Sequence, residues 1–236
     1  MATNQIFQHG TLGLLVPGLY DGTITAGDLL KHGDTGIGTL DGLNGEVIIL
    51  DGHAYQARED GQIREIAPTE TLPFASVHFE APQQTAEVHQ LKMTDFQTQV
   101  ADEYQLANVF AAVRVDGMFK QVKTRVAPHQ TKPYKTLVNA TATQPEFEGT
   151  DVKGTIIGYF APHLFQGATV GGFHLHFLSA DHQLGGHLLG FEIDQAKLSL
   201  QKFADFQVHL PIENVDYLAE KFDNDTIDSA INKAER

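Results

Sequence analysis

The sequence predicts an α+β, strand-rich protein in which two sheet-containing subdomains pack together with a few short helices. Three observations support this fold class. Glycine is abundant, at 22 residues, and much of it follows Asp or Asn in the pairs that form tight hairpin turns. The runs between these pairs are rich in β-branched and aromatic residues, which suit a pleated sheet. Patterns typical of helices are few and short.

In the N-terminal half, residues 28–32 predict a short helix that ends at Gly33, and residues 46–50 predict a strand with a turn pair on each side. Residues 94–97, Thr-Asp-Phe-Gln, have the form of a capping box and predict a helix through about Tyr104.

A hairpin is expected next, over residues 108–126, with its turn at Asp116-Gly117. One of its faces carries valine and alanine and is typical of core. The opposite face carries Arg114, Phe119, Lys123 and Arg125. An arginine there could bind a carboxylate through two parallel hydrogen bonds, although solvated surface charge explains the pattern equally well.

In the C-terminal half, residues 155–160 predict a strand, and residues 215–222 and 226–234 predict amphipathic helices. The segment 128–145 contains three prolines and is expected to be a long connection. We therefore expect an N-terminal mixed-sheet subdomain over residues 1–130. A β-rich, metal-binding subdomain with the terminal helices is expected over residues 131–236.

Composition excludes several classes of protein. The chain has no cysteine, which rules out disulfides, thiolate metal ligands and thiol nucleophiles. Its formal charge of −14 disfavours nucleic acid and anionic lipid surfaces as partners. The N-terminus does not resemble a signal peptide and no apolar run is long enough to span a bilayer, so we expect a cytoplasmic protein that does not bind membranes.

Residues 171–191 carry the strongest functional signal and predict a strand, a polar turn and a second strand. Alternate side chains of a strand share a face, so His174 and His176 point to the same side. If the turn is centred on residues 181–182, antiparallel register places His187 directly opposite His176. The three histidines then share one face of the hairpin.

Three imidazoles at this spacing could converge on one metal ion. Because the chain lacks cysteine, the ligands must be His, Asp or Glu. Three nitrogen ligands suit Zn²⁺ best, although Cu, Fe and Ni also accept imidazole. A site with three protein ligands keeps positions open for water or substrate, as in catalytic zinc sites. Alternatively, His174, His176 and His187 are ordinary polar residues of an amphipathic strand.

Glu46 is the second candidate for chemistry. It follows Asn44-Gly45 and begins an otherwise apolar strand, so its carboxylate could lie beside buried surface and transfer protons. Many strands, however, begin with a glutamate that only contacts water.

With these residues identified, the chain resembles the α-acetolactate decarboxylase family from about Thr11 to the C-terminus. Three blocks carry the resemblance: residues 19–22 with 31–40 and 43–46, residues 116–125 with Lys-Pro-Tyr at 132–134, and residues 172–177 with Gly-Gly-His at 185–187.

The resemblance implies zinc bound by the three histidines, with Arg125 and Glu46 beside the metal and Thr39 near the substrate. It also implies a C-terminal glutamate over the site, for which Glu235 is the best match and Glu220 the reserve. Members of the family are strand-rich dimers, so a homodimer is expected.

The implied reaction is decarboxylation of 2-acetolactate, a 2-hydroxy-3-oxo acid, to acetoin and CO₂. The metal would stabilise an enediolate as a Lewis acid, with Arg125 orienting the carboxylate and Glu46 or Glu235 transferring protons. Two other functions stay open at this point. A cupin-like metal-dependent oxygenase or isomerase would also carry a His-x-His pair on a strand, and a non-catalytic metal- or sugar-binding module would need no reaction.

Overall fold

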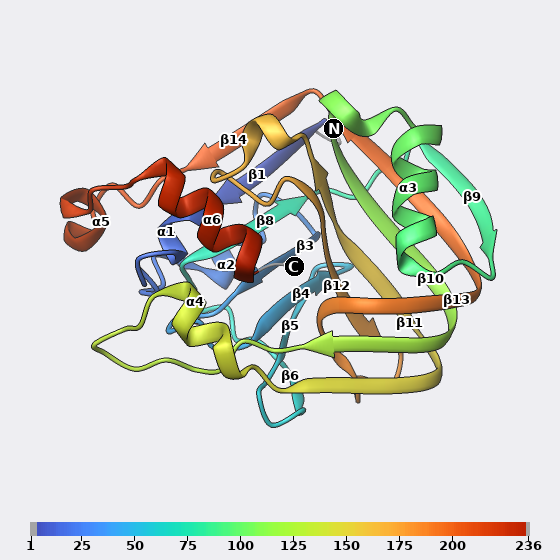
Figure 1. The fold of residues 1–236 in the computed structure, drawn as a ribbon, viewed down its shortest axis with the longest axis horizontal. Coiled ribbons are helices and arrows are strands. Elements are labelled where there is room, and N and C mark those ends of the chain that lie inside the picture. Colours follow the sequence, from blue (N-terminus) through green and yellow to red (C-terminus); the bar gives the residue numbers. More distant parts are fainter. Residues whose placement is uncertain (1–3, 235–236) are drawn as a thin grey trace.

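The computed structural model describes residues 4–234 and contains two large sheets (Figure 1). The first sheet has seven strands in the order β14-β1-β8-β3-β4-β5-β6. Its strands are β1 (Gln5–His9), β3 (Thr35–Thr39), β4 (Glu46–Leu50), β5 (His53–Ala57), β6 (Ile63–Glu65), β8 (Phe74–His78) and β14 (Asp205–His209). The short strands β2 (Ile24–Thr25) and β7 (Thr71–Leu72) pair separately. The expected strand-rich α+β class is confirmed.

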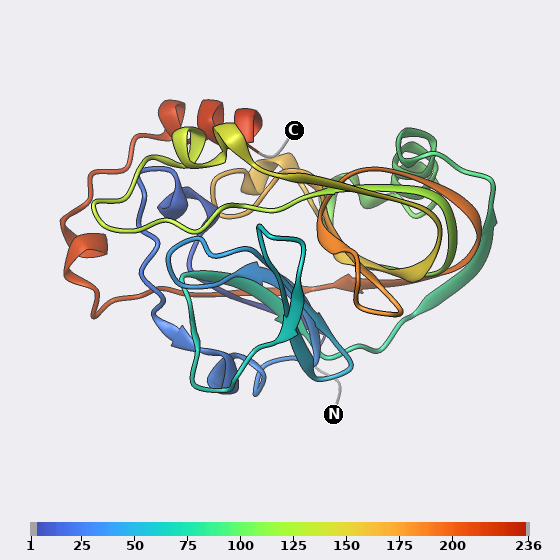
Figure 2. The ribbon, with the colours of Figure 1, turned by 90° about the horizontal axis from the view of Figure 1, so that it is seen from below.

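The second sheet closes on itself. Its strands are β9 (Gln84–His89), β10 (Phe110–Arg125), β11 (Glu146–Ala161), β12 (Gly172–Ser179) and β13 (Gly185–Phe203). Each of β10 to β13 pairs with the next, and β10 also pairs with β13, so these strands form the ring visible in Figure 2. β9 extends the ring from the free edge of β13. We call β10 to β13 the barrel.

Helices are short and lie around the two sheets, as expected. They are α1 (Leu12–Leu15), α2 (Ala26–Leu29), α3 (Met93–Glu103), α4 (Leu137–Ala140), α5 (Val215–Ala219) and α6 (Asn224–Ala234), with 3-10 turns η1 (Leu106–Asn108), η2 (Thr141–Thr143) and η3 (His163–Phe165). α3 forms where a helix was expected but begins at Met93, and its N-cap, Lys92, makes no side-chain capping bond. Thr94 is therefore inside the helix, and the expected capping box is wrong.

The expected hairpin at Asp116-Gly117 is also wrong, because β10 runs through this pair as one continuous strand. Gly117 pairs with Gly154 on one side and with Ala196 on the other. A Cβ atom at Gly117 would lie 2.4 Å from the Cβ of Ala196. The glycine is therefore required by the close approach of β13 and not by a turn. Phe119, expected on the polar face, is fully buried in the barrel core.

Alternation along the barrel strands separates two cores. Inward side chains such as Val113, Leu175 and Phe177 fill the barrel together with Phe96 of α3. Outward side chains such as Ile157 pack against Ile48 of the first sheet. The face of β4 that points toward the barrel therefore meets the outward face of β12, and functional residues lie between them.

The border between the sheets differs from the expected boundary near residue 130. β9, α3 and β10 precede residue 130 yet belong with the barrel, and β14 follows it yet pairs in parallel with β1. The division into residues 1–130 and 131–236 stays a prediction about folding units. Within residues 4–234, no helix combines the length and apolar character needed to cross a membrane.

Candidate active site

A row of polar side chains crosses three adjacent strands of the barrel. Arg125 on β10 lies opposite His187 on β13, and His187 lies opposite His176 on β12. Directly opposed residues of an antiparallel pair point to the same face. His174 precedes His176 by two residues and shares that face. All four side chains are buried between the barrel and the first sheet.

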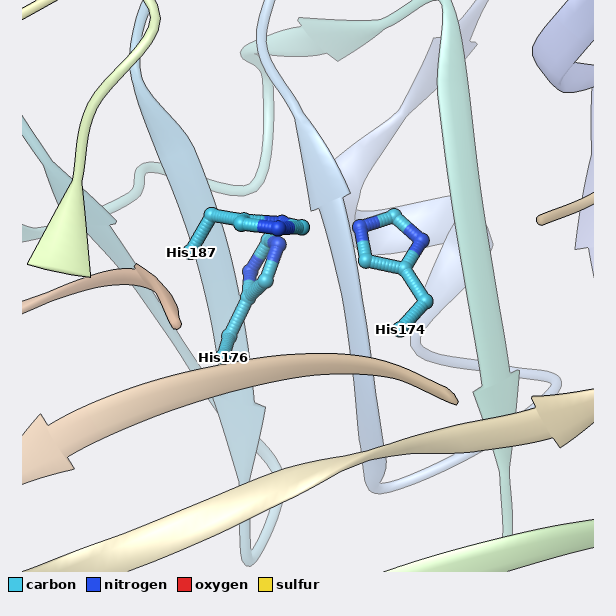
Figure 3. Close-up of side chains that lie close together, drawn as sticks. All are labelled: His174, His176 and His187. Atoms are coloured by element: carbon cyan, nitrogen blue, oxygen red, sulfur yellow. The ribbon is translucent and has the colours of Figure 1, made fainter. Parts of the chain in front are cut away.

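The three histidines converge (Figure 3). One ring nitrogen from each of His174, His176 and His187 lies within 4.8 Å of the other two, and the ring centroids are 5.0 to 5.5 Å apart. The expected register of His176 opposite His187 is confirmed, and so is the shared face. These residues could hold a metal ion.

A contact to the first sheet determines which nitrogen of His176 could bind metal. Nδ1 of His176 lies 3.0 Å from the carbonyl oxygen of Val47, on β4. Since a carbonyl only accepts, Nδ1 carries the proton and donates it. The lone pair of a neutral His176 ring is then on Nε2. Metal-binding histidines commonly donate their other nitrogen to a carbonyl in this way, which fixes the orientation of the ring.

The surroundings of His174 and His187 disfavour protonation of these two histidines. Burial, and then the charge of Arg125, lowers the pKa of His174 to about 3. The pKa of His187 is lowered well below its ordinary value, first by burial and then by Arg125 and the two other histidines. Metal ions bind neutral imidazole, so protons compete weakly for this set of nitrogens near neutral pH. The donor set fits a divalent metal that accepts nitrogen ligands.

Glu46 extends from the start of β4 toward His176. Its Oε1 atom accepts a hydrogen bond of 3.1 Å from the backbone N–H of Ala127, and its Oε2 atom lies 3.5 Å from Nε2 of His176. The hydroxyl of Thr39 donates to the carbonyl of Gly45 at 2.8 Å, directly before Glu46. Ala127 therefore holds the carboxylate beside the candidate metal site, and Thr39 fixes the backbone just before Glu46.

A cavity opens over these groups. Apart from the histidines, Glu46 and Arg125, the cavity has a mostly apolar wall that comes from several separate segments. Its members are Leu12, Leu15, Leu43, Phe74, Ala127 and Leu137, with Thr39, Thr141 and Gln144 adding polar groups. Among the described residues that line the cavity, Arg125 is the only arginine or lysine.

The structure thus brings together six residues singled out from the sequence: Thr39, Glu46, Arg125, His174, His176 and His187. Glu235 lies outside the described residues. Glu220 lines a different surface groove, beside Phe222 and Thr136. Arg114, expected on the same face as Arg125, instead binds Asp51, Glu80 and Asp116 at 2.7 to 2.9 Å.

Sequence reasoning missed Gln144 and the apolar wall. Gln144 lies in the proline-containing connection and accepts a hydrogen bond of 2.7 Å from Nη1 of Arg125. A single glutamine in a polar segment gives no signal of such a contact. Leu12 and Phe74 are far from the histidines in sequence, so no local pattern connects them with the site.

The fold and the site define a class: a strand-rich protein with a closed barrel and a buried three-histidine cluster that could bind metal beside a carboxylate and a guanidinium. Comparison with known proteins gives the family. The family profile described as Alpha-acetolactate decarboxylase matches residues 6–224. The chain belongs to the alpha-acetolactate decarboxylase family.

Individual relatives agree over nearly the full length. The alpha-acetolactate decarboxylase of Streptococcus thermophilus is 37% identical over 98% of both chains, and that of Lactococcus lactis subsp. cremoris is also 37% identical over 98% of both. The crystal structure of the Bacillus subtilis strain 168 enzyme is 34% identical, covers 98% of this chain and 99% of its own, and has a TM-score of 0.95. The expected family and the expected enzyme class, a carboxy-lyase, are confirmed.

Proposed function

We propose that this chain converts 2-acetolactate to acetoin and CO₂ with Zn²⁺ bound by His174, His176 and His187. The observation that carries the proposal is the arrangement of Arg125, His187 and His176 side by side across three strands, with Glu46 at 3.5 Å from Nε2 of His176. A guanidinium, three nitrogen ligands and a carboxylate thus border one cavity. The family membership favours this function over a cupin-like enzyme or a binding module.

The chemistry explains why these groups are needed. When the carboxylate of 2-acetolactate leaves as CO₂, the electron pair of the broken bond moves onto the neighbouring ketone and leaves an enediolate. Bound zinc would supply Lewis-acid stabilisation of that negative charge. His174, His176 and His187 are the residues that would hold this ion.

Arg125 would bind the substrate carboxylate before it leaves. The protein carries a formal charge of −14, which repels an anion over most of its surface. The positive charge of Arg125 would attract the anion within the cavity. Its planar guanidinium can make two parallel hydrogen bonds to a carboxylate. Because its guanidinium is buried, these hydrogen bonds form in a low-dielectric environment, where they are stronger.

Glu46 would transfer the proton that replaces CO₂. The N–H of Ala127 holds one of its oxygens, so the other remains directed toward the cavity and His176. A carboxylate fixed in this way can take the proton of the substrate hydroxyl and deliver it to the carbon that has lost CO₂. A proton from solvent then restores the hydroxyl, so one proton is taken up per turnover. Thr39 would support this role by fixing the loop before Glu46. Glu235 is proposed as a second acidic group near the site.

We also propose that the chain acts as a homodimer. The edge strand β14 and the exposed apolar side chains that follow it support this proposal. These side chains are Leu210, Ile212, Val215, Leu218 and Phe222. Light scattering of the purified protein tests it, and a mass near the 25.9 kDa of one chain would contradict it.

The function is tested by turnover. Purified protein is depleted of metal with a chelator, then supplied with Zn²⁺ or, as a control, Mg²⁺, and mixed with 2-acetolactate while acetoin is measured. We expect activity to disappear on depletion and to return with zinc alone, at one ion per chain. Zinc-loaded protein that binds one ion per chain yet forms no acetoin above the uncatalysed background would refute the proposal.

A further inference from the structure

The 2.7 Å contact between Arg125 and Gln144 joins the cavity to the connection that follows β10. Gln144 directly follows the 3-10 turn η2, and Glu146, two residues later, lies opposite Arg125 in the β10–β11 ladder. The backbone N–H of Val126 donates to Pro145 at 3.1 Å. Gln144 is therefore fixed next to the end of β10, and its side chain borders the cavity.

The acceptor that Gln144 offers is neutral. Its amide oxygen restricts the rotation of the guanidinium and leaves the positive charge unchanged, whereas a carboxylate at the same position would neutralise that charge. Gln144 thus contributes geometry to Arg125 without reducing its attraction for an anion.

We propose that Gln144 is a positioning residue that orients the Arg125 guanidinium toward a substrate carboxylate and, because it is uncharged, preserves the affinity of the cavity for a monoanion. The inference deepens the proposed function and rests on it for the identity of the substrate. Gln144 itself need not contact the reacting atoms.

Two substitutions separate the two parts of this role. Gln144→Met keeps the length of the side chain but removes the acceptor, so it tests orientation. Gln144→Glu keeps an acceptor and adds a negative charge, so it tests neutrality. Gln130→Met is the matched control, because Gln130 belongs to the same connection and bonds to the carbonyl of Pro128. Thermal unfolding and zinc content are measured for every variant.

The main readout is binding, measured by calorimetry with zinc-loaded protein and a pair of unreactive ligands, 2-hydroxyisobutyrate and its carboxamide. These ligands differ in the charge of the group that Arg125 would bind. We expect the wild type to prefer the carboxylate. This preference should fall about tenfold in both variants. In Gln144→Met the hydrogen bond that orients Arg125 is lost, and in Gln144→Glu the charge of Arg125 is compensated. The control should keep the wild-type preference.

Steady-state kinetics with 2-acetolactate provide the second readout. In Gln144→Glu, KM should rise about tenfold while kcat changes less than threefold, as expected for loss of binding that ground state and transition state share. If Gln144→Met unfolds at a lower temperature than the control, the inference is judged from the Gln144→Glu variant alone.

A carboxylate preference within twofold of wild type in Gln144→Glu would overturn the inference, whatever the turnover. The wild type could fail to form acetoin while its preference for the carboxylate ligand still depends on Gln144. That result would refute the proposed function but would support the carboxylate-binding role of Arg125 and Gln144.

Discussion

At the scale of single residues, the candidate metal site depends on side chains from one local hairpin. Alternation along β12 and the register across its turn were enough to predict that His174, His176 and His187 share a face, and the structure confirms this. Local geometry could be derived because only a few residues separate the two strands. Arg125 and Glu46 had weak patterns of their own, and the family resemblance was needed to relate them to the histidines.

Replacing His176 with alanine is expected to abolish tight metal binding, because two imidazoles and water hold a divalent ion far less well than three imidazoles. The measurement is zinc per chain after dialysis, by mass spectrometry of the metal. His182→Ala is the control, since His182 lies exposed in the turn of the same hairpin. If His176→Ala retained a full equivalent of zinc, the three-histidine site would be excluded.

Replacing Glu46 with glutamine should leave zinc in place but reduce kcat by roughly 10²–10⁴-fold, the usual effect of removing a general acid–base group. Glutamine keeps an acceptor for the N–H of Ala127, so the local fold should persist. Acetoin formation and metal content are compared with wild type. Normal turnover in a zinc-loaded variant would remove Glu46 from the proton-transfer step.

At the scale of elements, turn pairs predicted some hairpins and failed at others for a physical reason. Asp51-Gly52 does connect β4 and β5, with φ of 52° and 82° at the two positions, as a two-residue hairpin requires. Asp116-Gly117 is the same Asp-Gly pair but lies inside β10. There, close packing against β13 requires the glycine. Local sequence cannot distinguish these two reasons for a glycine.

The same comparison predicts the effect of substitution. At Gly52 a Cβ would contact nothing within 4 Å, so the cost of Gly52→Ala comes only from the positive φ of 82°. We expect a loss of about 1 kcal/mol in the free energy of unfolding, measured with urea. Gly190→Ala is the matched control, because its Cβ also meets nothing within 4 Å and it lies in the extended strand β13. Equal stability of the two variants would contradict this explanation.

Closure of the barrel could not be predicted. The pairing of β10 with β13 joins residues about 60 to 90 positions apart, such as Val113 with Leu200 and Arg125 with His187. Periodicity reports which side of a strand is buried but not which strand lies next to it. For the same reason the contact between Arg125 and Gln144, and the wall formed by Leu12 and Phe74, had no signal in the sequence.

At the scale of the whole molecule, a buried histidine links the two sheets. Nδ1 of His78, on β8, lies 2.9 Å from the hydroxyl of Tyr159, on β11. Burial lowers the pKa of His78 to about 4, and the charge of Asp34 and the carbonyl of Thr35 oppose this only in part. The native protein therefore keeps His78 neutral under conditions in which the unfolded chain would protonate it.

The pH dependence of stability follows from this difference. Above pH 6.5 the residue is neutral in both states, and its contribution is complete. Between pH 6.5 and about 4 the unfolded state binds a proton that the native state refuses, so stability falls by about 3 kcal/mol in total. The free energy of unfolding in urea is measured at pH 7.5 and 4.5 for wild type, His78→Gln and the exposed control His53→Gln. Of the two variants, only His78→Gln should lose less free energy of unfolding between pH 7.5 and 4.5 than wild type does. If it loses as much as wild type, His78 does not cause the acid sensitivity.

The parallel pairing of β1 with β14 has a consequence for synthesis on the ribosome. β1 leaves the exit tunnel well before β14, because the strand that covers its edge is translated about two hundred residues later. Until then the nascent first sheet exposes the unpaired backbone groups of β1, where another unfinished chain could pair with it. Slow translation of the segment between β1 and β14 should therefore increase aggregation, whereas rapid synthesis of β14 should reduce it.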